Sequence, residues 1–149
     1  MFETIKSLTM KAALKLAQAV QSEADSQGFA MNVVVVDRSG LPLVVLRNPK
    51  APDASLEFAE RKAYTAANYG WPTAKWQDIV GERPLVMQGL AQNPKVSLIA
   101  GGVPVNADDE TIGGLGVAGA KAPEDHAVAS AGLEAFLARH ERIGDWLKP

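Results

Sequence analysis

The segment over residues 111–126, "TIGGLGVAGAKAPEDH", distinguishes between two possible folds. Its glycines could form either a nucleotide-binding loop or part of a strand. Gly114, Gly116 and Gly119 have the G-x-G-x-x-G spacing of dinucleotide-binding loops, and the residues after them are predicted to form a helix. Such a loop also requires a parallel strand after that helix, with an acidic end that holds the ribose. The helix takes up most of the chain beyond Gly119, and no β-branched run follows it. We therefore predict a glycine-rich strand here, and no binding of NAD, FAD or ATP.

The residues between these glycines are themselves typical of a strand, since Leu115, Val117 and Ala118 are apolar. Glycine inside a strand marks a bulge or the close approach of another backbone or a ligand. We expect six glycines to let a ligand or a neighbouring subunit reach the backbone, namely Gly101, Gly102, Gly113, Gly114, Gly116 and Gly119.

Two groups of predicted strands surround a helical middle. A first helix is expected from its cap Thr9 to Gly28, followed by a β-branched strand over residues 31–37 that is buried on both faces. The short turn "RSG" joins this strand to another over 41–47, which makes the two an antiparallel hairpin. The other predicted elements are helices over 55–69 and 73–80, strands over 95–100, 101–107 and 111–119, and a last helix over 123–140.

This order of elements predicts an α+β fold, with a five-stranded antiparallel sheet on which the helices pack. The segment "RPLVMQGLAQNP" receives no assignment. The length of 149 residues suits one domain, so we expect residues 1–149 to form a single unit.

Composition excludes several classes of function. The formal net charge is −2, which gives no electrostatic reason to expect a nucleic-acid partner or an anionic membrane surface. The absence of cysteine excludes disulfides, thiolate metal sites and a cysteine nucleophile. The first residues carry charges throughout and contain no apolar run of the kind found in signal peptides or membrane spans. We expect a cytoplasmic protein.

The sequence contains only two histidines, His126 and His140. A zinc site of the two- or three-histidine kind would need carboxylates to complete it, and no H-E-x-x-H spacing is present. No G-x-S-x-G elbow of a serine hydrolase is present either. We predict no metal site from protein ligands alone, and we attribute His140 to the end of the last helix.

The whole chain resembles the GlcG/HbpS-like family, whose members are often described as haem-binding or haem-degrading domains. The resemblance covers about residues 8–137 and is most specific where the Lys62-Ala-x-Thr-Ala helix occurs together with the double-glycine segments. The five segments that carry it are "AALKLAQAVQSEADSQG", "VVVVDRSGLPLVVLR", "SLEFAERKAYTAANY", "IAGGVPV" and "TIGGLGVAGAKAPEDHAVASAGL".

The resemblance implies an α/β/α sandwich of the profilin-like type, symmetric homo-oligomers, and binding of a small ligand, with haem or a corrinoid-pathway context known for some members. The chain departs from the family at His126, where relatives often carry an acidic residue. It departs again in the loop "RNPKAPDAS", where many relatives have a methionine and an aspartate soon after the arginine.

Two cations are candidate ligand-binding residues. Lys62 shares a helix face with Thr65, and its ammonium could hold a ligand carboxylate, act as an acid or base, or extend to solvent. Arg47 ends a strand beside a proline-containing loop and suits a carboxylate, although an ion pair with Asp53 or Glu57 is an equal alternative. The loop between them is short, so we expect both cations to face one pocket. We also expect Lys62→Met to weaken binding without unfolding the protein.

Three further polar residues lie near turns or near the glycine strand. Asp37 is favoured as a turn residue that bonds its own backbone, with a ligand role as the alternative. Asp125 and His126 occupy the first turn of the last helix, where Asp125 suits the helix dipole. His126 is the first choice for an iron ligand or a general base.

Two hypotheses follow. The first is a homo-oligomeric protein that binds a small carboxylated or tetrapyrrole ligand such as haem between the glycine strand, Lys62 and Arg47. The second is a cofactor-independent enzyme that acts on a carboxylate substrate, with Lys62, Asp125 or His126 as acid and base. The aromatic group Tyr69, Trp71 and Trp76 is favoured as core over a pocket lining or a subunit interface.

Overall fold

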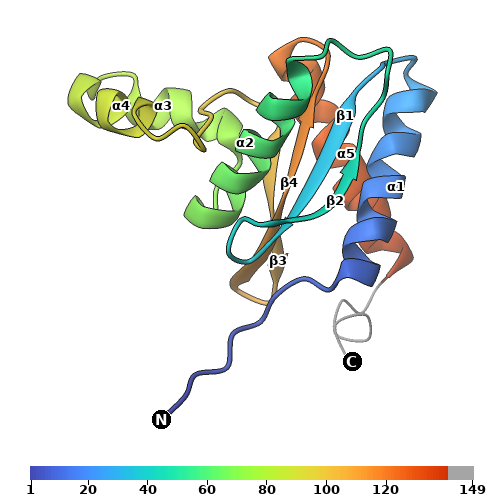
Figure 1. Ribbon diagram of the computed structural model, residues 1–149, viewed down its shortest axis with the longest axis horizontal. Coiled ribbons are helices and arrows are strands. Elements are labelled where there is room, and N and C mark those ends of the chain that lie inside the picture. The colour runs from blue at the N-terminus through green and yellow to red at the C-terminus, as the bar shows by residue number, and fades with distance from the viewer. Residues whose placement is uncertain (141–149) are drawn as a thin grey trace.

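A computed structural model describes residues 1–140 (Figure 1). Helices cover both faces of one antiparallel sheet, and a short helical arm projects from the side. The strands are β1 (Asn32–Asp37), β2 (Pro42–Leu46), β3 (Gly102–Ala107) and β4 (Glu110–Ala118). The helices are α1 (Met10–Ser26), α2 (Ser55–Tyr69), the 3-10 turn η1 (Thr73–Lys75), α3 (Trp76–Val80), α4 (Pro84–Ala91) and α5 (Ala122–Arg139).

The sheet has the strand order β2-β1-β4-β3, and every neighbouring pair is antiparallel. The two hairpins, β1–β2 and β3–β4, therefore meet along β1 and β4 in the middle of the sheet. Val34 of β1 lies opposite Gly116 of β4, which places the glycine-rich segment in a central strand. This confirms the prediction that Gly114 and Gly116 belong to a strand and not to a phosphate-binding loop, while Gly119 lies just beyond the end of β4.

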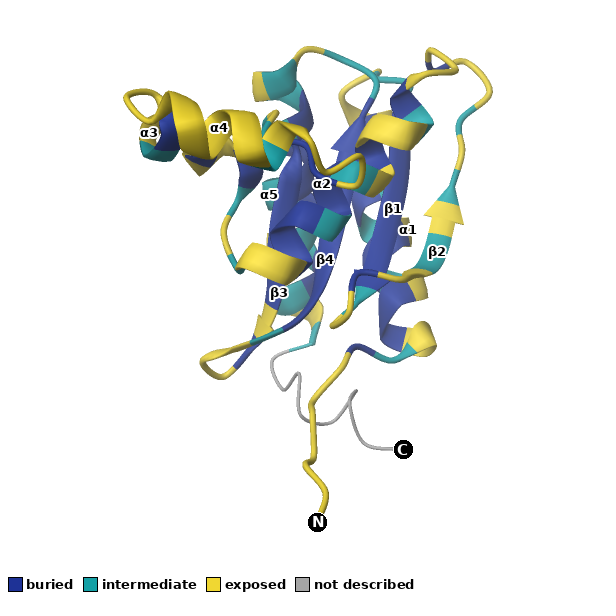
Figure 2. Cartoon of the chain, turned by 60° about the vertical axis from the view of Figure 1, so that its left-hand side comes forward, coloured by how far each residue is buried: buried dark blue, intermediate teal, exposed yellow. Residues whose placement is uncertain are grey.

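The two sheet faces have different cores. On one face α1 and α5 pack together, and Val33 and Val35 of β1 belong to a large aliphatic cluster with them. On the other face α2 packs alone, with its alanines against Val34 and Val36. All four valines are fully buried, as expected for a strand covered on both sides (Figure 2).

Glycines in β4 bring α2 unusually close to the sheet. A Cβ added at Gly114 would overlap the backbone oxygen of Ala63, and one added at Gly116 would overlap that of Ala59. The close approach that the sequence suggests for a ligand or another subunit is therefore made by α2 of the same chain. This corrects the expectation for Gly114 and Gly116.

The prediction of a five-stranded sheet is wrong by one strand, because residues 95–100 form no strand. Backbone N–H groups of this segment bond to local or side-chain oxygens instead of to a neighbouring strand. The N–H of Val96 donates to the carbonyl of Asn93, and that of Ser97 donates to Oγ1 of Thr65 at 2.9 Å. A strand-like sequence thus becomes an irregular wall beside α2.

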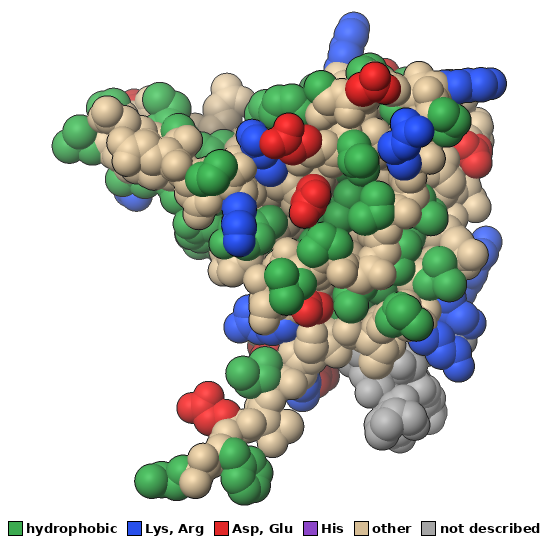
Figure 3. Space-filling view, viewed as in Figure 1, with side chains coloured by type: hydrophobic (Ala, Val, Ile, Leu, Met, Phe, Trp, Pro, Cys, Tyr) green, Lys and Arg blue, Asp and Glu red, His purple; other side chains and the backbone are tan. Residues whose placement is uncertain are grey.

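The segment that the sequence left unassigned contains helix α4, which forms the projecting arm together with α3. None of the eight residues of α4 is buried, although most are apolar. Leu85 is 81% exposed, and Val86 and Met87 are also exposed. Figure 3 shows hydrophobic side chains on the outer part of this arm. Within residues 1–140, no helix combines the length and apolar character needed to cross a bilayer.

Candidate small-molecule site

A hollow of about 550 Å³ opens between the α3–α4 arm, the segment before β3 and the first turn of α5. We call it the Ile99 hollow. Its apolar lining residues include Val80, Met87, Leu98, Ile99, Ala122 and Pro123, and its polar ones include Thr73 and Gln77. The volume lies within the range of about 300–1,000 Å³ that is usual for small-molecule sites. An apolar lining with few polar groups is also typical of such sites.

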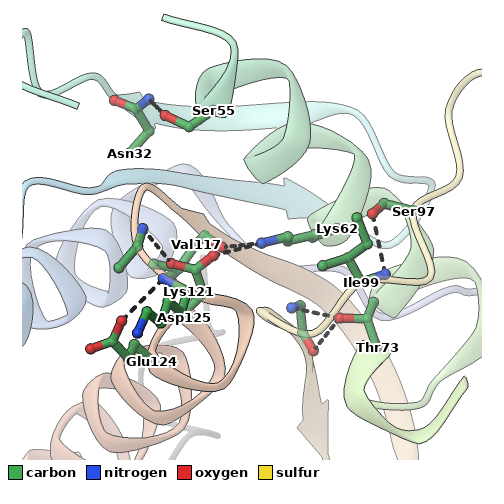
Figure 4. Close-up of polar contacts among 12 residues, drawn as sticks. Asn32, Ser55, Lys62, Thr73, Ser97, Ile99, Val117, Lys121, Glu124 and Asp125 are labelled. Atoms are coloured by element: carbon green, nitrogen blue, oxygen red, sulfur yellow. Dashed lines mark hydrogen bonds and ion pairs between the residues drawn. The ribbon is translucent and has the colours of Figure 1, made fainter. Parts of the chain in front are cut away.

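A buried ion pair lies beside this hollow, between Lys62 of α2 and Asp125 of α5 (Figure 4). The two charged atoms are 2.8 Å apart, and each residue is only 2% exposed. Lys62 Nζ also donates to the carbonyl of Val117 at 3.1 Å, and the second carboxylate oxygen of Asp125 accepts from the N–H of Ala120 at 3.0 Å. One pair thereby connects helices on opposite faces of the sheet with the end of β4.

Burial shifts the ionisation of this pair. Desolvation raises the pKa of the Asp125 carboxyl above its ordinary value, while the hydrogen bond from Lys62 opposes that rise. Loss of solvation is the larger effect because the carboxylate lies inside the protein.

The two glycines before β3 lie against Lys62. Gly101 has a φ of +129°, and an added Cβ would lie 2.8 Å from Lys62 Nζ. An added Cβ at Gly102 would overlap the carbonyl of Lys62. The N–H of Gly102 donates to the hydroxyl of Thr73 at 2.8 Å, so a residue that lines the hollow also holds this turn. Here too the chain itself fills the space that we predicted for a ligand.

Thr65, a predicted ligand-binding residue, is fully buried and bonded to the protein. Its hydroxyl donates to the carbonyl of Arg61 at 2.7 Å and accepts from the N–H of Ser97. In the structure Thr65 therefore fixes the segment that continues into the wall of the hollow.

The structure separates Arg47 from Lys62. Arg47 is exposed just beyond β2, at an edge of the sheet, whereas Lys62 is enclosed with Asp125. The two cations do not face one pocket, because the charge of Lys62 is directed into the protein. Asp37 has the turn role that the sequence favoured, since one carboxylate oxygen accepts from the N–H groups of Ser39 and Leu41.

His126 is partly buried on α5 and does not belong to the lining of the Ile99 hollow. Its Nδ1 is enclosed and has no hydrogen-bond partner among the described residues, and its Nε2 lies 3.5 Å from the hydroxyl of Ser130. Residues 1–140 contain no group of three or more His, Asp or Glu side chains placed to hold a metal ion.

The aromatic cluster divides between core and surface. Trp76 is buried, and its ring lies 4.9 Å from that of Tyr69 and 5.5 Å from that of Trp71, centroid to centroid. Tyr69 and Trp71 remain partly exposed, so only one of the three is core.

Sequence reasoning missed the residues that line the hollow. Met87, Leu98 and Ile99 come from a segment without assignment and from a segment predicted as a strand. One signal was available, since the eight residues of α4 include no charged side chain. A short uncharged apolar helix in a globular domain indicates a surface that covers something.

Fold and site together define a class: a single-sheet α+β domain in which a buried Lys–Asp pair lies beside an apolar hollow. Within that class, the chain belongs to the HbpS-like family, since the family model "Haem degrading protein HbpS-like" matches residues 8–134. The resemblance inferred from the Lys62 helix and the glycine segments is confirmed.

Solved structures support the same assignment. The crystal structure of a double mutant of Streptomyces reticuli HbpS is 35% identical, with a TM-score of 0.82 over 90% of both chains. A PduOC:heme complex is 28% identical, with a TM-score of 0.79 over 87% of this chain and 94% of that one. Comparison by sequence gives a further relative, a 15.0 kDa protein of Citrobacter freundii from the dhaT-dhaS intergenic region. It is 31% identical over 90% of this chain and 95% of its own length.

Proposed function

We propose that the protein binds haem or another small molecule with a large apolar body, and that the ligand occupies the Ile99 hollow. The main support for this proposal is the hollow itself, an apolar space of about 550 Å³ in which the lining residue Thr73 accepts a hydrogen bond from Gly102. The solved haem complex of a relative supports haem as one ligand to test.

The residues of the hollow fit the apolar part of a haem. Leu98, Ile99 and Val80 would pack against the macrocycle, and Met87 offers a thioether, one of the side chains that ligate haem iron in proteins. Bound haem would supply an iron centre capable of one-electron chemistry. Since His126 is not part of the lining, Met87 replaces it as the first candidate for iron ligation.

We still propose a carboxylate on the ligand, but the two cations predicted to hold it do not lie together in the structure. Arg47 and Lys62 are apart, so they cannot clamp it together. Among the described residues, the lining of the hollow includes no cation, and the first turn of α5 already carries Glu124 and Asp125 at the positive end of its dipole. We therefore propose that the carboxylate extends out of the hollow into solvent.

Binding is favoured over catalysis by the burial of Lys62 and Asp125. A general acid or base must reach the substrate, and these two groups are directed at each other inside the protein. We also propose a cytoplasmic location and a homo-oligomer. The oligomer is supported by the uncovered apolar residues of α4.

A haem titration followed by absorption spectroscopy tests the proposal. We expect a saturable shift of the Soret band, and we expect Ile99→Glu to abolish it by placing a charge in the hollow. Leu41→Glu is the matched control, because Leu41 is also an exposed apolar residue but does not line the hollow. A parent protein without a Soret shift would refute haem binding, and a shift unchanged in Ile99→Glu would refute the location.

A further inference from the structure

We propose that Lys62 and Asp125 are positioning residues for the Ile99 hollow, because one buried ion pair anchors both of its walls. The inference rests on the proposed function, since it assumes that the hollow is the ligand site. One wall consists of residues 98–100, before β3, and the other is the first turn of α5.

The first wall is anchored through Gly101, the residue directly after it. Gly101 lies against Lys62 Nζ so closely that even a Cβ would come within 2.8 Å of it. Its carbonyl accepts from the N–H of Val117 at 2.9 Å, and Lys62 Nζ donates to the carbonyl of that same residue. The end of the wall is therefore bonded to β4 at Val117, the same residue whose carbonyl accepts from the ammonium of Lys62.

The second wall is anchored through Asp125. This residue lies one helical turn after Ala122, which lines the hollow. One carboxylate oxygen accepts from Lys62, and the other accepts from the N–H of Ala120, in the connection between β4 and α5. The carboxylate thus fixes where the last helix begins and how its first turn faces the opposite wall (Figure 4).

Stability alone does not account for a charged pair at this place. Taking two charges out of water costs several kcal/mol per ion, and well-packed apolar residues of similar volume are often as stabilising or more so. Hydrogen bonds differ from apolar contacts in being directional. The hydrogen bonds of this pair, including its two bonds to the backbone, allow only a narrow range of distances and angles. They therefore fix the separation of the two walls more closely than apolar contacts would.

The test replaces the whole pair with apolar residues in Lys62→Met/Asp125→Leu, so that no lone charge is left buried. Binding of the fluorescent apolar anion 8-anilinonaphthalene-1-sulfonate to the folded protein is then compared with the free energy of unfolding. We expect the double variant to bind the probe with a Kd at least about tenfold higher than that of the parent, equivalent to about 1.4 kcal/mol. Its free energy of unfolding should change little.

The matched control removes an exposed pair in Lys6→Met/Asp108→Asn, and asparagine tolerates the positive φ of 55° at position 108. This control should bind the probe as the parent does. A parent protein that binds neither haem nor the probe would refute the proposed function. A parent that binds, together with a folded double variant of equal affinity, would overturn the positioning role while leaving the proposed function intact.

A second variant decides the matter if the double variant does not fold. Lys62→Arg keeps the charge but replaces a point donor with a wider planar fork, which shifts the contacts to Val117 and Asp125. We expect this variant to fold and to bind the probe more weakly. Unchanged affinity in Lys62→Arg would contradict the inference.

Discussion

Gly116 shows how much a single missing side chain can determine. A Cβ at this position would overlap the carbonyl of Ala59 and lie 2.6 Å from the backbone nitrogen of Ala63, both in α2. Neither atom can move without moving the helix. Helix-on-sheet packing thus explains the first two glycines of the spacing, Gly114 and Gly116, whereas the third, Gly119, has a φ of +150° and lies against the backbone of Ala30.

Gly116→Ala should lower the free energy of unfolding by roughly 1–3 kcal/mol, the usual cost of forcing extra volume into a packed core. Denaturant unfolding measures it. Gly89→Ala is the control, since an added Cβ there has no neighbour within 4 Å and the site lies inside α4. That variant should gain up to about 1 kcal/mol from helix propensity. A neutral Gly116→Ala would show that α2 can shift away from β4.

Lys62→Met should destabilise the fold by about 3–5 kcal/mol, because it leaves the carboxylate of Asp125 buried without its partner. This replaces the expectation from sequence that the substitution would leave the fold intact. Unfolding curves of Lys62→Met and of the double variant with Asp125→Leu give the comparison, and the double variant should be the more stable of the two. Equal stability of both variants would show that Asp125 finds another partner.

The raised pKa of Asp125 predicts a direction of pH dependence. The native state holds the proton more tightly than the unfolded state, whose carboxyl titrates near 3.8. The contribution of Asp125 to stability therefore falls as pH rises from that value through the higher native pKa. Carbon NMR of the Asp125 carboxyl should give a midpoint above 3.8. A midpoint at or below this value would mean that Lys62 outweighs the loss of solvation.

At the scale of elements, residues 95–100 are the one segment predicted as a strand that forms none among the described residues. All four strands were predictable, because runs of strand-forming residues and tight hairpin turns act locally. The conformation of residues 95–100 depends on Thr65, some thirty positions earlier, whose hydroxyl accepts a hydrogen bond from the N–H of Ser97. No periodicity within the segment reveals a bond to a distant side chain.

Thr65→Val should release this segment while keeping the volume of the side chain. The N–H of Ser97 would lose its acceptor in a buried environment, at a cost of about 1–3 kcal/mol. Faster hydrogen exchange at Ser97 than in the parent would be the direct sign. Ser130→Ala is a suitable control, because its hydroxyl makes only a 3.5 Å contact to His126. Unchanged exchange at Ser97 would mean that the segment is held by packing.

For the molecule as a whole, the uncovered helix α4 is the feature that a single chain leaves unexplained. An isolated helix of eight residues is marginal in water. We expect it to be covered by a second copy, so that Leu85→Glu/Val86→Glu lowers the assembly mass. Light scattering at micromolar concentration measures this, with Leu41→Glu as the control. A parent protein of 15.8 kDa in solution would refute the homo-oligomer.

The candidate site was predictable only in part, because its assembly depends on contacts between segments that are far apart in the sequence. Lys62, Asp125 and Gly101 could be singled out by residue type and motif, and the structure does bring them together. Their direction could not be read from sequence, since a lysine on a helix face can point to solvent or into the protein. The apolar lining of the hollow comes from three separate segments, and its assembly depends on the whole fold.

The strand order β2-β1-β4-β3 has a consequence for synthesis on the ribosome. Strand β1 emerges early and gains β2 at once, but its other neighbour ends at Ala118. Until that residue has left the exit tunnel, one edge of a largely apolar strand lacks its partner, and α2 lacks the glycine surface on which it packs. The nascent first half therefore exposes an unpaired apolar edge of the kind that favours aggregation, and the sheet is complete only after the last third of the chain has emerged.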